Sequence, residues 1–166
     1  PFIRPKEISQ DLSTDLECIK HCVDWLKDNQ KYIPDIIVQL RPTQPNRKVS
    51  DIDKAIKIFS DNIKNYDSLR SVIPIKKSCF KMYTIENNLL NPTFNVFKNI
   101  KEPYNQCRQI LPQTYLHNGY IDIIKTSLLK NNTISGEKIL PFIMEEVDNI
   151  DIDDLEDWEK SNSNFN

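Results

Sequence analysis

Asp35-Ile36-Ile37-Val38-Gln39-Leu40 is the stretch that decides the fold. It is a short, mostly β-branched apolar run between Pro34 and Pro42, and such a run is typical of a strand buried on both faces of a parallel sheet. The next five residues read Arg-Pro-Thr-Gln-Pro, and their prolines predict a stiff, non-helical loop. The stretch therefore predicts a sheet strand that ends in a rigid loop carrying Arg41.

Helical patterns flank this strand on both sides. Thr14-Asp15-Leu16-Glu17 fits a capping box, and apolar residues at helical spacing then predict an amphipathic helix over residues 15–29. Ser50 can cap a second helix, over whose inward face apolar residues recur. A further strand is expected at residues 68–73. The alternation of helix and strand predicts an α/β fold, a Rossmann-like layered sheet with mostly parallel strands.

The middle of the chain has a different texture. Residues 74–115 are polar and interrupted by prolines, with short β-like pieces, so we expect a β-rich excursion from the sheet. Hairpins of this kind suit a dimerisation surface or a lid over a substrate, and we expect a homodimer. Strands resume at residues 120–124 and 139–144, followed by a helix near residues 153–160 and a polar tail over residues 161–166.

The composition limits the possible partners. The 166 residues carry 22 basic and 24 acidic side chains, a net charge of -2, without a basic stripe, so no nucleic-acid partner is expected. No apolar run reaches the length of a membrane span, and the first residues lack a signal-peptide pattern, so we expect no membrane association. The four cysteines form no C-x-x-C pair. These features predict a cytoplasmic protein with reduced thiols.

Acidic residues alternate with isoleucine near the C-terminus. Asp151 and Asp153 flank Ile152, and at the end of a strand their carboxylates would share one face. Their mutual repulsion would be relieved by a hard cation such as magnesium, which also bridges to substrate phosphates. The spacing alone favours the alternative, in which these acids form the first turn of the last helix.

Arginines beside prolines are candidate ligands for an anion. Arg108 lies in a proline-flanked loop, where its planar guanidinium can clamp a carboxylate. Arg41 and Arg47 flank the rigid loop after the first strand, and ligands of open α/β sheets bind at the carboxyl ends of strands. His117, directly before Asn118-Gly119, is interpreted as a turn residue.

Several short motifs occur in a fixed order along the chain. They are Arg4-Pro5 with Asp11 downstream, residues 40–47 (Leu-Arg-Pro-Thr-Gln-Pro-Asn-Arg), Cys107-Arg108-Gln109, Asn118-Gly119 and Asp151-Ile152-Asp153. This order resembles that of the acylneuraminate cytidylyltransferases, and the resemblance extends from Arg4 to Trp158. It implies a magnesium-dependent α/β enzyme that activates an acidic nonulosonic sugar with CTP, giving a CMP-sugar and pyrophosphate.

The resemblance also implies roles for individual residues. Asp151 and Asp153 would hold the metal ion, with Arg108 as a further catalytic residue, and Arg4 would lie on the nucleotide side. The residues that would contact the sugar acid are Arg41, Thr43, Lys81, Arg108, Gln109 and Asp122. Cationic side chains among them suit an acidic sugar.

Departures from the family pattern concern the sugar. The family's Thr-Ser-Pro reads Thr43-Gln44-Pro45, the tyrosine usual after Asn-Gly is replaced by Asp122, and two pocket aromatics correspond to Ile134 and Ser135. A legionaminic or pseudaminic type of acid is therefore as compatible as N-acetylneuraminic acid. A cytidylyltransferase for an eight-carbon keto-deoxy sugar acid is an alternative.

The family's N-terminal strand and phosphate-binding loop have no counterpart before Arg4. We therefore expect a single truncated domain over residues 1–160, which lacks the backbone donors that wrap a triphosphate and does not turn over alone. A non-catalytic remnant that binds a sugar or a partner is the alternative. The sequence leaves open which sugar acid is used and what Asp122 does.

Overall fold

The computed structural model describes residues 2–145, 152 and 154–163. Its helices are α1 (Asp15–Gln30), α2 (Val49–Asn62) and α3 (Leu155–Ser163), with 3-10 turns η1 (Lys6–Ile8), η2 (Cys79–Lys81), η3 (Pro103–Asn105), η4 (Arg108–Ile110) and η5 (Thr126–Asn131). Its strands are β1 (Ile36–Gln39), β2 (Ser68–Ile75), β3 (Tyr83–Glu86), β4 (Leu89–Pro92), β5 (Val96–Phe97), β6 (Ile100–Lys101), β7 (Thr114–Lys125) and β8 (Ile139–Ile143). Within this described part, none of the helices is long and apolar enough to cross a membrane.

The main sheet has four strands in the order β1-β7-β2-β8. β7 pairs antiparallel with β1 and β2, whereas β2 and β8 pair parallel. Three of these four strands run in one direction and β7 runs against them, so the sheet contains one parallel and two antiparallel pairings instead of mostly parallel ones. β7 is antiparallel because the chain leaves the sheet along β2 and returns beside it, pairing Ile75 with Thr114.

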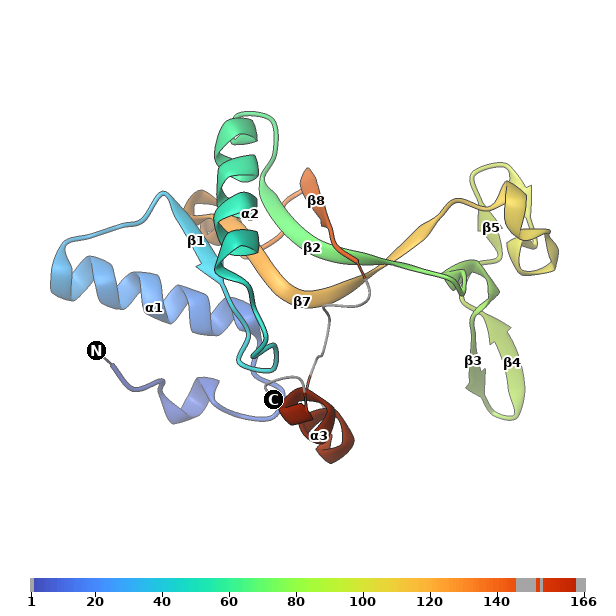
Figure 1. Ribbon diagram of the computed structural model, residues 1–166, viewed down its shortest axis with the longest axis horizontal. Helices are drawn as coiled ribbons and strands as arrows, with labels where there is room; N and C mark the ends of the chain where they lie inside the picture. Colours follow the sequence, from blue (N-terminus) through green and yellow to red (C-terminus); the bar gives the residue numbers. More distant parts are fainter. Residues whose placement is uncertain (1, 146–151, 153, 164–166) are drawn as a thin grey trace.

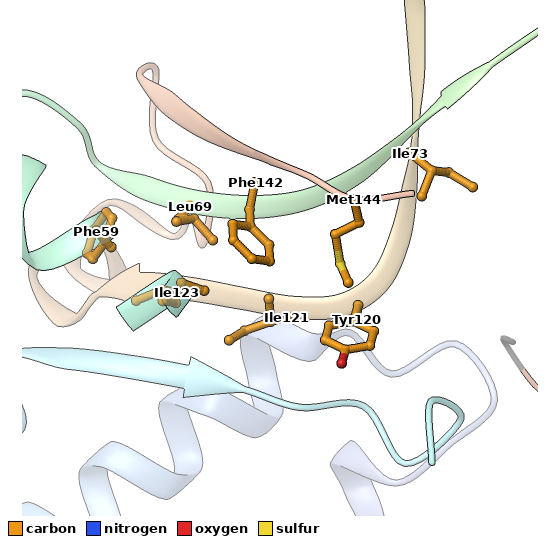
Figure 2. Packing of buried hydrophobic residues seen from close by; sticks show 9 residues of the cluster. Phe59, Leu69, Ile73, Tyr120, Ile121, Ile123, Phe142 and Met144 are labelled. Atoms are coloured by element: carbon orange, nitrogen blue, oxygen red, sulfur yellow. The ribbon is translucent and has the colours of Figure 1, made fainter. Parts of the chain in front are cut away.

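The two faces of the sheet are covered by different helices. α2 places Ala55 and Phe59 against Leu69, Ile121 and Ile123, and all five side chains are fully buried. Figure 2 shows this cluster between α2 and the strands. On the other face, Ile19 and Val23 of α1 form a second cluster with Ile124 of β7 and with Leu128 and Leu129 of η5. Because neighbouring residues of β7 point to opposite faces, this arrangement confirms the predicted layered α/β fold.

The predicted elements appear with two corrections. α1 begins at the expected capping box, in which the Thr14 amide donates to Glu17 Oε2 at 2.7 Å. Ser50 does not cap α2, because the helix begins one residue earlier and the Lys48 amide donates to the hydroxyl of Tyr120 at 2.7 Å. β1 is half-buried along its length rather than buried on both faces, because it is the terminal strand of the described sheet.

The arm, which we define as residues 74–115, begins and ends in the paired ends of β2 and β7 and extends away from the rest of the sheet (Figure 1). It carries the hairpins β3–β4 and β5–β6 at the opposite end of the molecule from α1 and β1. Phe80 is buried within it, and the centroid of its ring lies 5.1 Å from the ring centroid of Phe94 and 4.5 Å from that of Phe97. The arm therefore has a small aromatic core of its own.

Candidate functional site

Two motifs that are far apart in sequence are joined at the end of β1. The side chain of Gln44 is buried and donates from Nε2 to the carbonyl of Asn118 at 2.6 Å. Arg47 donates from Nε to the carbonyl of Tyr120 at 2.6 Å, and from Nη2 to the carbonyl of Arg41 at 2.6 Å. The loop after β1 is thus fastened to β7 by side chains that bind main-chain oxygens.

The Asn118-Gly119 motif forms an irregularity in β7. Between the pairs Val72–His117 and Arg70–Asp122, β2 advances two residues whereas β7 advances five. Gly119 has a φ of +66°, which a residue with a side chain rarely adopts. The bulge turns His117 back over the sheet, so that its Nε2 lies 3.3 Å from Asp122 Oδ2.

Asp122 is a buried carboxylate held by three cationic or potentially cationic side chains. Its side chain is only 2% exposed. Arg41 Nη1 lies 2.8 Å from Oδ2, Arg70 Nε lies 3.0 Å from Oδ1, and His117 completes the set from the bulge. We call Asp122, Arg41, Arg70 and His117 the Asp122 cluster. A buried charge with this many partners is compensated, whereas an isolated one would be very costly.

The partners of Asp122 decide its ionisation. Burial acts to raise the pKa of Asp122, but the hydrogen bonds from His117 and Arg41 and the charge of Arg70 outweigh it. The pKa falls from its ordinary value of 3.8 to about 2. The carboxylate is therefore charged throughout the neutral range, where it accepts hydrogen bonds and does not act as a proton donor.

The Asp122 cluster has a polar surrounding on the same face of the sheet. Gln39 lies directly across from Asp122 on β1, and its buried Oε1 has no partner among the described residues. On the opposite side, Arg70 Nη2 lies 3.3 Å from Ser135 Oγ. Gln39, Asp122 and Arg70 thus form a row of polar side chains across the neighbouring strands β1, β7 and β2.

The predicted metal ligands, Asp151 and Asp153, lie outside the described residues. Between them in sequence, Ile152 is described, and its amide donates to the carbonyl of Thr43 at 2.9 Å. Residue 152 therefore lies on the loop that carries Arg41. Among the residues that the structure describes, no three His, Cys, Asp or Glu side chains gather as a metal site would require.

The other predicted site residues fall into two groups. Arg41 contacts Asp122 at the sheet end, and Thr43 follows Arg41 on the same loop. Lys81, Arg108 and Gln109 lie in the arm, at the opposite end of the molecule. Lys81 donates from Nζ to the carbonyls of Tyr104 and Gln106, at 3.0 and 2.6 Å, and Arg108 is exposed. One chain does not bring the two groups together.

Arg4 lies apart from both groups in the N-terminal segment. Its side chain is exposed, and Nε donates to the carbonyl of Ile8. This contact ties Arg4 to the turn η1, which follows it in the chain.

Sequence reasoning missed two members of the cluster. The predicted strand at residues 68–73 contains Arg70 without assigning it a role, and His117 is interpreted there as a turn residue. A signal was present, because Leu69-Arg70-Ser71 and Ile121-Asp122-Ile123 each place one charge inside an apolar strand. Buried charges need partners, so opposite charges in two such strands predict that the strands are neighbours and that the charges pair.

Comparisons with known proteins agree with this fold and these motifs. No protein-family model matches the chain. The chain is 27% identical over 159 residues to an N-acylneuraminate cytidylyltransferase of Escherichia coli O18:K1:H7 (strain RS218 / NMEC). The match covers 95% of this chain and 35% of that relative, so the chain spans about a third of the length of the curated relative.

One solved structure is similar to the chain in fold. A CMP:2-keto-3-deoxy-manno-octonic acid synthetase, solved in complex with CTP, is similar with a TM-score of 0.56. The similarity covers 93% of this chain and 69% of that one, at 14% sequence identity. The chain is thus similar in sequence to an N-acylneuraminate cytidylyltransferase and similar in fold to a CMP:2-keto-3-deoxy-manno-octonic acid synthetase.

Proposed function

We propose that the full-length protein is a cytidylyltransferase that transfers CMP from CTP to an acidic sugar and releases pyrophosphate. The observation that carries the proposal is the joined structure at the end of the sheet. There the family motifs of residues 40–47 and 118–119 hold each other in place and present Arg41 beside a compensated carboxylate. The similarity to an N-acylneuraminate cytidylyltransferase supports the reaction class.

The proposed role of Arg41 is to bind the carboxylate of the sugar acid. A guanidinium offers two parallel N–H donors to a carboxylate, which fixes both distance and orientation. Asp122 is too deeply buried to contact a sugar, so its proposed contribution to substrate binding runs through Arg41 and Arg70. Thr43 lies on the same loop. Orienting the sugar's anomeric hydroxyl toward the α-phosphate of CTP is the main task of such a site.

Asp151 and Asp153 are the proposed magnesium ligands, and Arg4 the proposed nucleotide contact. The described acids offer no competing metal site, and the buried Asp122 is already occupied by three side chains. Magnesium would neutralise phosphate charge as pyrophosphate leaves. The hydrogen bond from the Ile152 amide to the Thr43 carbonyl supports this assignment. Ile152 separates the two aspartates in sequence, and Thr43 belongs to the loop that carries Arg41.

The proposed assembly is a homodimer in which the arm of one copy completes the site of the other. Lys81, Arg108 and Gln109 cannot reach Arg41 within one chain, since the arm points away from the sheet end. The arm also exposes apolar side chains, with Ile85 74%, Leu89 66% and Leu90 62% exposed. A surface of this kind is typical of a protein contact. We place the reaction in the cytoplasm, which the four free thiols support.

The proposed function is tested with the full-length protein, CTP, magnesium and a panel of sugar acids. The panel holds N-acetylneuraminic, legionaminic and pseudaminic acids and an eight-carbon keto-deoxy acid. We expect one acid to give a CMP-sugar with an equal amount of pyrophosphate. Arg41→Gln should raise the KM for that acid while changing the KM for CTP little. Turnover of none of them by folded protein would favour the non-catalytic alternative.

A further inference from the structure

The guanidinium of Arg41 is shared by two carboxylates that differ in exposure. Nη1 lies 2.8 Å from Asp122 Oδ2, and Nη2 lies 2.7 Å from Asp15 Oδ2. The Asp122 side chain is 2% exposed and the Asp15 side chain 45% exposed. The buried Asp122 thus holds one side of the guanidinium, and the solvent-exposed carboxylate of Asp15 covers the other side.

The two ion pairs differ in how readily they exchange. Asp122 is also bound by Arg70 and His117, and separating it from Arg41 would leave a buried charge with fewer partners. Asp15 is the first residue of α1, and its bond to Arg41 is an exposed ion pair of the kind that contributes little free energy. The nearby Glu17 carboxylate accepts hydrogen bonds from the Thr14 amide and hydroxyl, so it is not free to take the place of Asp15 at Arg41. Of the two ion pairs of Arg41, the one with Asp15 is therefore the one that can be broken by an incoming ligand.

We propose that Asp15 occupies the face of Arg41 that receives the carboxylate of the acidic sugar, so that substrate binding exchanges one carboxylate for another. This inference rests on the proposed function. Asp122 is then a positioning residue, which holds the guanidinium in place during the exchange. Asp15 is a competitor of the substrate, because a ligand must bring its own carboxylate to replace Asp15 at Arg41.

The exchange affects acidic and neutral sugars differently. An acidic sugar replaces the Asp15 contact with a contact of the same charge, and Asp15 regains full hydration. A neutral sugar of the same shape offers nothing that competes with Asp15 for Arg41. The contact from Asp15 therefore lowers the affinity for every acidic ligand slightly, and it leaves the affinity for neutral analogues, which do not displace it, unchanged.

The test compares two variants of the full-length protein that remove the same charge from α1. Asp15→Asn removes the contact to Arg41, whereas Asp24→Asn removes an exposed carboxylate on the same helix. The ligands are N-acetylneuraminic acid, the eight-carbon keto-deoxy acid and the methyl ester of each. Dissociation constants are measured by calorimetry without CTP, and the KM for sugar and for CTP are measured in turnover.

Asp15→Asn should tighten binding of the acid by about two- to fivefold, the range that an exposed ion pair allows. Its KM for the acid should fall similarly, whereas the KM for CTP, the affinity for the methyl ester and all constants of Asp24→Asn should stay the same. Equal effects on acid and ester, or unchanged or weaker binding of the acid, would overturn the inference. A folded wild-type protein that binds neither acid would instead overturn the proposed function, and this inference with it.

Discussion

Asp122 links three elements through its carboxylate, and this makes its ionisation a term in the stability of the fold. It joins the loop after β1, strand β2 and the bulge of β7 through Arg41, Arg70 and His117. Because the pKa of Asp122 is lower in the folded protein than its ordinary value, its contribution to stability is present above about pH 4. That contribution is lost as the pH falls from about 4 toward 2.

Asp122→Asn should therefore change both the stability and its dependence on pH. At pH 7 we expect a loss of about 3–5 kcal/mol in the free energy of unfolding, because two arginines lose a buried partner. Between pH 5 and pH 2, the wild type should lose about 2 kcal/mol more than the variant. Urea titrations across this range measure both quantities. Parallel pH profiles for the two proteins would show that Asp122 is not the titrating group.

Asp151 offers a second test at the scale of single residues. In the full-length protein, Asp151→Asn should abolish magnesium-dependent CMP-sugar formation, because a neutral amide is a poor ligand for a hard cation that bridges to phosphates. The unfolding temperature should remain within a few degrees of the wild type. Activity is measured over a magnesium titration, with Asp24→Asn as the control. Full turnover at the same magnesium concentration would remove Asp151 from the proposed site.

At the scale of elements, a residue distant in sequence caps the N-terminus of α2 in place of a local side chain. The Lys48 amide donates to the hydroxyl of Tyr120, which in turn lies 3.1 Å from Asp51 Oδ2. Tyr120 is 1% exposed and sits in the bulge region of β7. The helix that packs on the sheet is thus positioned by the same strand segment that carries the Asp122 cluster.

Tyr120→Phe should cost about 1 kcal/mol in the free energy of unfolding, as the loss of a helix cap does. Ser50→Ala is the matched control and should cost only a few tenths of that, since Ser50 does not cap the helix. Chemical denaturation of both variants gives the comparison. A larger cost for Ser50→Ala than for Tyr120→Phe would contradict the observed cap.

The elements also show what the sequence could and could not predict. α1 followed from apolar periodicity and its capping box, and α2, β1 and β2 followed from the spacing of apolar residues, which are local signals. The direction of β7 did not follow, because an apolar run such as Tyr120 to Ile124 carries no information about which way it runs. The cap of α2 was missed for a related reason, since Tyr120 is far from Lys48 in sequence. Likewise, Arg41 and Asp122 were recognised singly, but the cluster depends on pairing between strands.

At the scale of the whole molecule, the arm separates two sets of predicted substrate residues. Arg41 stands at the end of the sheet that meets α1, and Arg108 lies in the arm at the opposite end (Figure 1). A site that uses both must be shared between two copies of the chain. The proposed homodimer is therefore a requirement of the proposed site and not an addition to it.

Leu90→Asp should weaken this assembly. Leu90 is 62% exposed and pairs across the hairpin with Ile85, so a charge there would enter the proposed apolar contact without unfolding the arm. Leu12→Asp changes a side chain that is 93% exposed outside the arm and serves as the control. Sedimentation of the full-length protein should show a dimer for the wild type and Leu12→Asp, and a monomer for Leu90→Asp. A monomeric wild type would refute the shared site.

The hydrogen bonds from Arg47 separate the architecture of the sheet end from its chemistry. Its guanidinium binds the main-chain carbonyls of Arg41, Gln44 and Tyr120, and such oxygens are present whatever side chain a residue carries. These three hydrogen bonds do not depend on the side chain at position 41, so the loop after β1 can keep its path when Arg41 is replaced. If Arg41 contacts the sugar acid as we propose, the anchoring of this loop is separate from substrate binding, provided that Arg47 is retained.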